Sequence, residues 1–74
     1  MDLPDLIEIR SDVMVGKPCL KGTRKPVYLI LEKLAAGETT EEILLMYPKI
    51  TRSHVGAALQ YAADIAREDI VLAS

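Results

Sequence analysis

The stretch "TTEEILLMYPKITRSHVGAALQYAADIAR", residues 39–67, predicts two helices joined by a tight turn. Thr39 and Glu42 have the spacing of a capping box, in which each residue satisfies a backbone N–H group of the other. A helix over 40–47, a three-residue turn and a longer helix over 51–67 are typical of a helix-turn-helix. Spacing alone leaves a generic three-helix bundle as the alternative.

The helix expected over 51–67 carries its apolar residues on one face. Thr51 stands where a capping residue belongs, and Pro48 ends the preceding helix. Aliphatic and small residues at helical spacing predict its buried face: Val55, Ala58, Leu59, Ala62, Ile65 and Ala66.

A further helix is expected over 26–36. Pro26 suits its first position, because a residue there needs no N–H group for helical hydrogen bonds. Gly37 suits the left-handed conformation that commonly ends a helix. Three helices with short connections are therefore expected.

Residues 6–25 predict a short β element. A strand is expected at 6–10, and a second extended piece at 19–21 after a turn that contains glycine and proline. The expected fold class is mainly α: a small three-helix helix-turn-helix bundle preceded by a short N-terminal β hairpin. One domain covers residues 1–74, with 68–74 as a short tail.

Composition limits the classes of function. The chain has 74 residues, enough for one small domain, and its 50% hydrophobic and 27% charged residues indicate neither disorder nor a membrane span. No apolar run approaches about 18 residues, and the start of the chain is acidic where a signal peptide is basic. We expect a cytoplasmic protein. One cysteine and one histidine are too few for a zinc site, so no metal or cofactor is expected.

The residues do not suggest an enzyme. Cys19 and His54 lack a third orienting group, and the chain is too short for a substrate cleft. Cys19 is expected to be a small buried hydrophobe, and His54 a solvated surface residue. We therefore expect neither catalysis nor a small-molecule substrate.

Positive charge is concentrated in one segment. The net charge of −2 argues against strong non-specific affinity for nucleic acid. Residues 13–31, however, hold four basic residues and no acidic one: Lys17, Lys21, Arg24 and Lys25. Local potential, rather than net charge, decides where a phosphate binds.

Gly16 and Gly22 invite comparison with a nucleotide-binding loop. Such a loop needs four residues between its glycines and a lysine after the second one. Here five residues separate the glycines, the lysine follows the first, and Pro18 removes an N–H group that a phosphate would use. We reject the nucleotide-loop interpretation.

In a helix-turn-helix, the first turns of the second helix enter the major groove of DNA. Arginine there addresses guanine, glutamine addresses adenine, and serine contacts either a base or a phosphate. Against this interpretation, Glu41 and Glu42 would face the DNA backbone. The candidate nucleic-acid contacts are Lys49, Arg52, Ser53, His54 and Gln60, together with Lys21, Arg24 and Lys25 from the basic segment.

Four stretches carry a resemblance to a known family. "GKPCLKGTRKPV" at 16–27 resembles the signature G-K-P-x-x-x-G-T-R-x-x-V of the domain-of-unknown-function 433 family. "AAGETTEEIL" at 35–44, "YP" at 47–48 and "VGAALQYA" at 55–62 are similar to further stretches of that family. The resemblance covers roughly residues 6–67.

The resemblance implies a homeodomain-like or winged-helix-like helical domain with a short β element. Some members look like VapB-type antitoxins of bacterial toxin–antitoxin pairs, which bind operator DNA as dimers and neutralise a PIN-type ribonuclease toxin. We therefore expect a DNA-binding, antitoxin-like transcriptional regulator that acts as a homodimer. The alternative is a dimerisation or protein-interaction module that does not bind DNA. The apolar tail residues Ile70, Val71 and Leu72 are candidates for a dimer or partner contact.

The signature is also expected to serve the structure. Its glycines would adopt backbone angles that other residues resist, Pro18 would stiffen the loop, and Thr23 would bond its own turn. Arg24 would tie the hairpin to a carboxylate such as Asp12 or to carbonyl groups at a helix end, with a phosphate contact as the alternative. The signature residues are Gly16, Lys17, Pro18, Gly22, Thr23 and Arg24.

Overall fold

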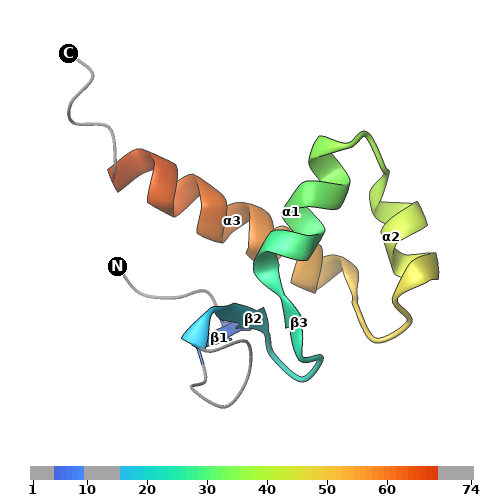
Figure 1. The fold of residues 1–74 in the computed structure, drawn as a ribbon, viewed down its shortest axis with the longest axis horizontal. Coiled ribbons are helices and arrows are strands. Elements are labelled where there is room, and N and C mark those ends of the chain that lie inside the picture. The colour runs from blue at the N-terminus through green and yellow to red at the C-terminus, as the bar shows by residue number, and fades with distance from the viewer. Residues whose placement is uncertain (1–4, 10–15, 69–74) are drawn as a thin grey trace.

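The computed structural model describes residues 5–9 and 16–68, which form three short strands and three helices (Figure 1). The elements in chain order are β1 (Ile7–Ile9), β2 (Pro18–Leu20), β3 (Lys25–Pro26), α1 (Val27–Ala35), α2 (Thr40–Met46) and α3 (Arg52–Glu68). The expected fold class is confirmed: the domain is mainly α, and a small β hairpin precedes its helices. Within the described residues, no helix is long and apolar enough to cross a membrane.

The strands form an antiparallel sheet in the order β1-β2-β3. Ile7 lies opposite Leu20, and Cys19 lies opposite Pro26. The strand β3 is absent from the sequence prediction, which placed Pro26 inside the first helix. Pro26 instead has extended angles, with φ −72° and ψ 149°, and it caps a helix that begins at Val27.

Hydrogen bonds in the turn between β2 and β3 reverse the direction of the chain, so that β3 can pair with β2. The backbone N–H and the hydroxyl of Thr23 both donate to the carbonyl of Leu20, at 3.1 and 2.8 Å. The N–H of Lys25 then donates to the Thr23 hydroxyl oxygen at 3.0 Å. Thr23 therefore bonds its own turn, as expected, and directs the chain back alongside β2.

The core lies between the sheet and the helices and is built from aliphatic side chains. Cys19 is buried, as expected, and its thiol donates to the carbonyl of Lys17. Leu59 and Ala66 were predicted to be buried, but Leu59 is 50% exposed and Ala66 is also exposed. The buried residues of α3 are His54, Val55 and Ala58, which all lie in its first two turns. The buried cluster consists of Ile7, Leu20, Val27, Ile30, Ile43, Ile50, Val55 and Ala58.

Local signals fix the connection between α1 and α2. Gly37 has φ 95° and donates to the carbonyl of Leu34, while Glu38 donates to the carbonyl of Lys33. These two bonds form a Schellman motif, which confirms the predicted left-handed end of the helix. The predicted capping box of Thr39 and Glu42 is also present at the start of α2, with bonds of 2.8 and 3.1 Å.

Candidate nucleic-acid interface

The turn that links β2 to β3, residues 21–25, is here called the basic turn. Its shape requires two residues with left-handed backbone angles, Gly22 at φ 83° and Arg24 at φ 60°. Lys21 and Arg24 are exposed, and within the described part of the chain neither forms an ion pair. The basic turn therefore presents two cations to solvent.

His54 connects the basic turn to the start of α3. Its side chain is only 8% exposed, and both ring nitrogens have partners. The backbone N–H of Thr51 lies 3.0 Å from Nδ1, and the carbonyl oxygen of Lys21 lies 3.0 Å from Nε2. An N–H group only donates and a carbonyl only accepts, so the neutral tautomer with its proton on Nε2 fits both partners.

The same histidine completes a cap on α3. The backbone N–H of His54 donates to the hydroxyl oxygen of Thr51 at 3.2 Å, while the His54 ring accepts from the Thr51 N–H. This is the reciprocal pattern of a capping box, with histidine in the place that Glu42 has in α2. Thr51 therefore caps the helix as expected.

The expectation of a surface-exposed His54 is wrong. Its ring is buried, and its nitrogens are used to cap α3 and to hold the carbonyl of Lys21, so it is not available to contact a phosphate or a base. Its effect is to fix the basic turn against the first turn of α3, 33 residues later in the chain. The other predicted contacts on these two segments lie near one another for this reason.

The outward face of α3 starts with Arg52 and Ser53 and continues through Gly56 to Gln60, and all four residues are exposed. A Cβ atom added at Gly56 would meet nothing within 4 Å. Gly56 therefore leaves open space on this face, which permits close approach of a large molecule. The amide of Gln60 donates to the carboxylate of Asp64 at 2.8 Å.

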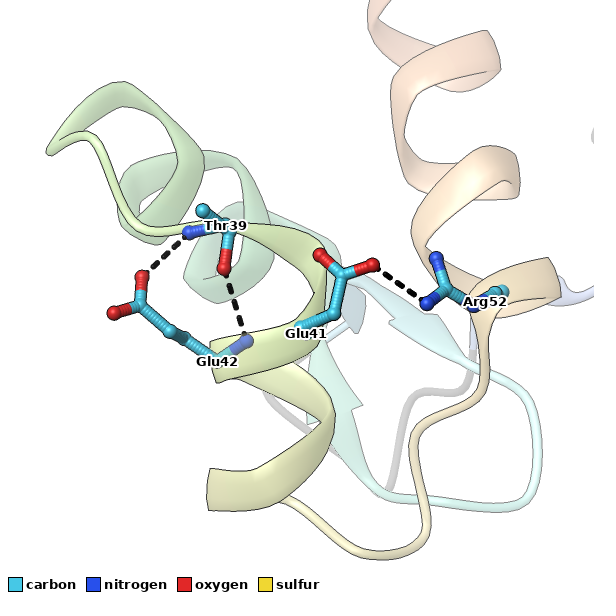
Figure 2. A network of polar contacts seen from close by, with 4 residues as sticks. All are labelled: Thr39, Glu41, Glu42 and Arg52. Atoms are coloured by element: carbon cyan, nitrogen blue, oxygen red, sulfur yellow. Dashed lines mark hydrogen bonds and ion pairs between the residues drawn. The ribbon is translucent and has the colours of Figure 1, made fainter.

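Arg52 is held by an acidic residue of α2. Its guanidinium donates to the Glu41 carboxylate at 2.6 Å, and both side chains are mostly exposed (Figure 2). This hydrogen bond and the charge of Arg52 hold the pKa of Glu41 below its ordinary value of 4.5. A guanidinium has five N–H donors, so Arg52 keeps donors for another ligand.

The two glutamates that argued against DNA binding are thus both engaged within the protein. Glu41 is neutralised by Arg52, and Glu42 is turned onto the backbone N–H of Thr39, as Figure 2 shows. The carboxylate of Glu42 also lies at the N-terminus of α2, where negative charge is favourable.

A groove of about 340 Å³ separates the basic turn from the turn between α2 and α3. Thr23 and Lys25 line one side, and Met46, Tyr47, Pro48, Lys49 and Ile50 line the other. The Lys25 ammonium lies 5.1 Å from the centre of the Tyr47 ring, in cation–π geometry. Lys49 is exposed.

The remaining predicted residues lie elsewhere. Lys17 and Pro18 line a separate pocket of about 240 Å³ with Tyr28 and Tyr61, away from the basic turn. Arg24 makes no hydrogen bond to a helix end or to a carboxylate within residues 5–9 and 16–68. The predicted contact with Asp12 falls outside the described residues, as do the tail residues Ile70, Val71 and Leu72.

Sequence reasoning missed the link made by His54. The spacing Thr-x-x-His was a usable signal for the cap, because it matches Thr-x-x-Glu at the previous helix. No pattern in the sequence around His54 indicates its hydrogen bond to the Lys21 carbonyl. Among the residues that the structure describes, no group of three histidine, cysteine or acidic side chains is placed to hold a metal ion.

Comparison with known proteins identifies the family of this chain. It is similar to a protein of Sinorhizobium fredii (strain NBRC 101917 / NGR234) named "Uncharacterized protein y4eO", with 31% identity over 58 residues. That alignment covers 78% of this chain but 26% of the relative, so the chain spans about a quarter of the relative's length. No solved structure matches the chain. The family model described as "Protein of unknown function (DUF433)" matches residues 7–62. The chain therefore belongs to the DUF433 family.

Proposed function

We propose that this protein binds DNA through the outward face of α3 and the adjacent basic turn. The observation that supports this proposal most directly is the bond between His54 and the Lys21 carbonyl. It fixes unpaired cations beside the exposed first turns of a helix that follows a short helix and a tight turn. A basic surface next to such a helix is the arrangement that helix-turn-helix proteins use on duplex DNA.

The residues divide into two roles in this proposal. Arg52, Ser53 and Gln60 lie on α3 and carry the chemistry that reads base edges in the major groove. Lys21, Arg24 and Lys49 are exposed cations that suit phosphates and position the protein without reading sequence. Lys25 adds to the positive potential from its position over the Tyr47 ring.

We further propose an antitoxin-like role in a bacterial toxin–antitoxin pair. This part rests on the family resemblance, which implies a cytoplasmic homodimer that represses its own operator and binds a PIN-type ribonuclease. Co-expression with the product of a neighbouring nuclease gene tests it. Suppression of the nuclease's toxicity supports the role, and unchanged toxicity contradicts it.

The DNA-binding proposal is tested with a fluorescent duplex from the region upstream of the protein's own gene. Arg52→Ala is expected to weaken binding by about 5- to 150-fold, which corresponds to about 1–3 kcal/mol for a lost base contact. Affinity is also expected to fall steeply with salt, because phosphate contacts release counterions.

Arg67→Ala is the matched control for this experiment. Arg67 is exposed on α3 and paired with Asp64 on the same helix, but it lies at the opposite end from Arg52. It should leave the affinity nearly unchanged. Equal losses in the two variants, or no binding by the wild-type chain, would contradict the proposal.

A second candidate function is a protein-interaction module. Leu45 is 82% exposed and Met46 is 42% exposed. Both lie in the last turn of α2, and Met46 also lines the groove. Large apolar side chains exposed together often mark a protein contact. Retention of a protein partner by a chain that binds no duplex would favour this candidate.

A further inference from the structure

The groove between the basic turn and the α2–α3 turn has an apolar lining flanked by two cations. Met46, Tyr47, Pro48 and Ile50 supply apolar surface. Lys25 lies on one side and Lys49 on the other. Met46 is 42% exposed, so part of this apolar lining faces solvent. Its chemistry suits an extended segment that carries acidic and aliphatic side chains together.

The chain itself contains a segment with this chemistry. Residues 68–72 read Glu-Asp-Ile-Val-Leu, so that two carboxylates are followed directly by three aliphatic side chains. The carboxylates complement Lys25 and Lys49, and the aliphatic side chains complement the lining of the groove. Successive side chains of an extended segment point to opposite sides, so Ile70 and Leu72 can enter the groove together.

Geometry excludes the groove of the same chain as the binding site. Helix α3 has 17 residues, which separates its ends by about 24 Å at 1.5 Å per residue. The groove lies beside Ile50, before the helix begins, whereas the acidic and aliphatic segment follows its far end. Leu72 is four residues beyond Glu68 and so lies at most about 14 Å from it, even if the chain is fully extended.

We propose that residues 68–72 of one chain bind in the groove of a second copy, and that the exchange is reciprocal in a homodimer. The C-terminal segment of each copy then covers Met46, Tyr47 and Ile50 of its partner. The inference rests on the groove and the segment, and it does not depend on DNA binding. Lys49 belongs to both surfaces, so the bound segment and a DNA phosphate would compete for this lysine.

A charge exchange in the 74-residue chain tests the proposal. One variant carries Lys49→Glu, which opposes the acidic segment of another copy. A second variant carries Glu68→Lys and Asp69→Lys, which oppose the wild-type groove. Each variant alone is expected to show a dimer dissociation constant at least about tenfold higher than that of the wild-type chain, because both contacts of the dimer are opposed.

Mixing the two variants is the decisive step. In the mixed dimer the acidic segment meets the wild-type groove, and the basic segment meets the groove that carries Glu at position 49. Light scattering should therefore show dimers in the mixture at concentrations where each variant alone is monomeric. Contacts within one chain cannot produce this rescue. Lys17→Glu is the matched control, because it makes the same charge change at the separate pocket and should leave the dimer intact.

Three results would overturn the proposal. The first is a wild-type chain that is monomeric throughout the concentration range, and the second is a dimer that Lys49→Glu leaves unchanged. The third is a failure of the two variants to associate when they are mixed. If Lys17→Glu dissociates the dimer and Lys49→Glu does not, the dimer contact lies at the pocket of Tyr28 and Tyr61 instead. Circular dichroism of each variant checks that the exposed substitutions leave the fold intact.

Discussion

The imidazole of His54 holds the backbone carbonyl of Lys21 at 3.0 Å, across 33 residues of sequence. One ring nitrogen completes the cap of α3, and the other fixes the basic turn. A single buried side chain thus sets where the basic turn of the family signature lies relative to the longest helix. The proposed DNA surface depends on this relationship.

Removal of this side chain should cost more stability than removal of an ordinary cap. His54→Ala leaves the Lys21 carbonyl and the Thr51 N–H without the partner of their part-buried bonds, and also removes a buried ring. The variant should lower the free energy of unfolding by about 2–3 kcal/mol. Glu42→Ala is the matched control, because it removes the corresponding side chain of the exposed capping box and should cost about 1 kcal/mol. Urea unfolding measures both. Equal costs would show that the bond to Lys21 adds nothing.

The protonated nitrogen of His54 can be observed directly. The chain has one histidine, so its long-range proton–nitrogen correlation spectrum contains one imidazole. The neutral imidazole should show a single tautomer with the proton on Nε2, because Nδ1 accepts from Thr51. A proton on Nδ1, or an average of both tautomers, is incompatible with the bonds described above.

The ion pair of Glu41 and Arg52 should make stability depend on pH in a defined window. Arg52 lowers the pKa of Glu41 below 4.5, so the folded state binds this proton less readily than the unfolded state does. The contribution is therefore complete above pH 4.5 and is lost as the pH falls through the lower, folded pKa.

Glu41→Gln isolates this contribution. The variant should be less stable than the wild-type chain at neutral pH, and the difference should shrink toward zero in acid. Denaturant midpoints measured at several pH values provide the comparison. A difference that stays constant with pH would mean that the carboxylate charge is not what stabilises the pair.

Much of the helical architecture could be predicted because its signals are local. The Thr39–Glu42 capping box and the left-handed Gly37 lie within a few residues of the groups they satisfy. The strand at Pro26 was missed because its pairing with Cys19 is a tertiary contact, and a proline before a helical pattern reads equally well as a first helical residue. The candidate site was predicted in part: the exposed residues of α3 follow from its period.

The burial of His54 could not be predicted in the same way. Its second partner is a backbone carbonyl, and every residue has one, so the identity of Lys21 carries no signal. The predicted burial of Leu59 was wrong for a related reason. Its spacing from Val55 fits the buried face, but the width of that face is set by what packs against α3.

Two substitutions of Gly56 are expected to affect stability and DNA affinity differently. Gly56→Ala should raise the free energy of unfolding by about 0.5–1 kcal/mol, because alanine is the better helix former and nothing obstructs its Cβ. Gly56→Leu should also fold, yet its side chain would stand between α3 and a duplex, and affinity should fall at least about tenfold.

Ala63→Leu is the control for that steric effect. Ala63 is exposed two turns further along the same face of α3, about 10 Å from Gly56. It should bind DNA almost as tightly as the wild-type chain. If Gly56→Leu retains wild-type affinity, the first turns of α3 do not enter a groove.

The surface itself is mapped most directly by a nuclear magnetic resonance titration of the labelled protein with its upstream duplex. Amide signals of Arg52, Ser53 and Gly56 should shift together with those of the basic turn, residues 21–25, since His54 holds these segments side by side. Signals of Gly37 and of the last turn of α3 should stay in place. Shifts confined to Leu45 and the groove, or no shifts at all, would contradict a DNA surface built from α3 and the basic turn.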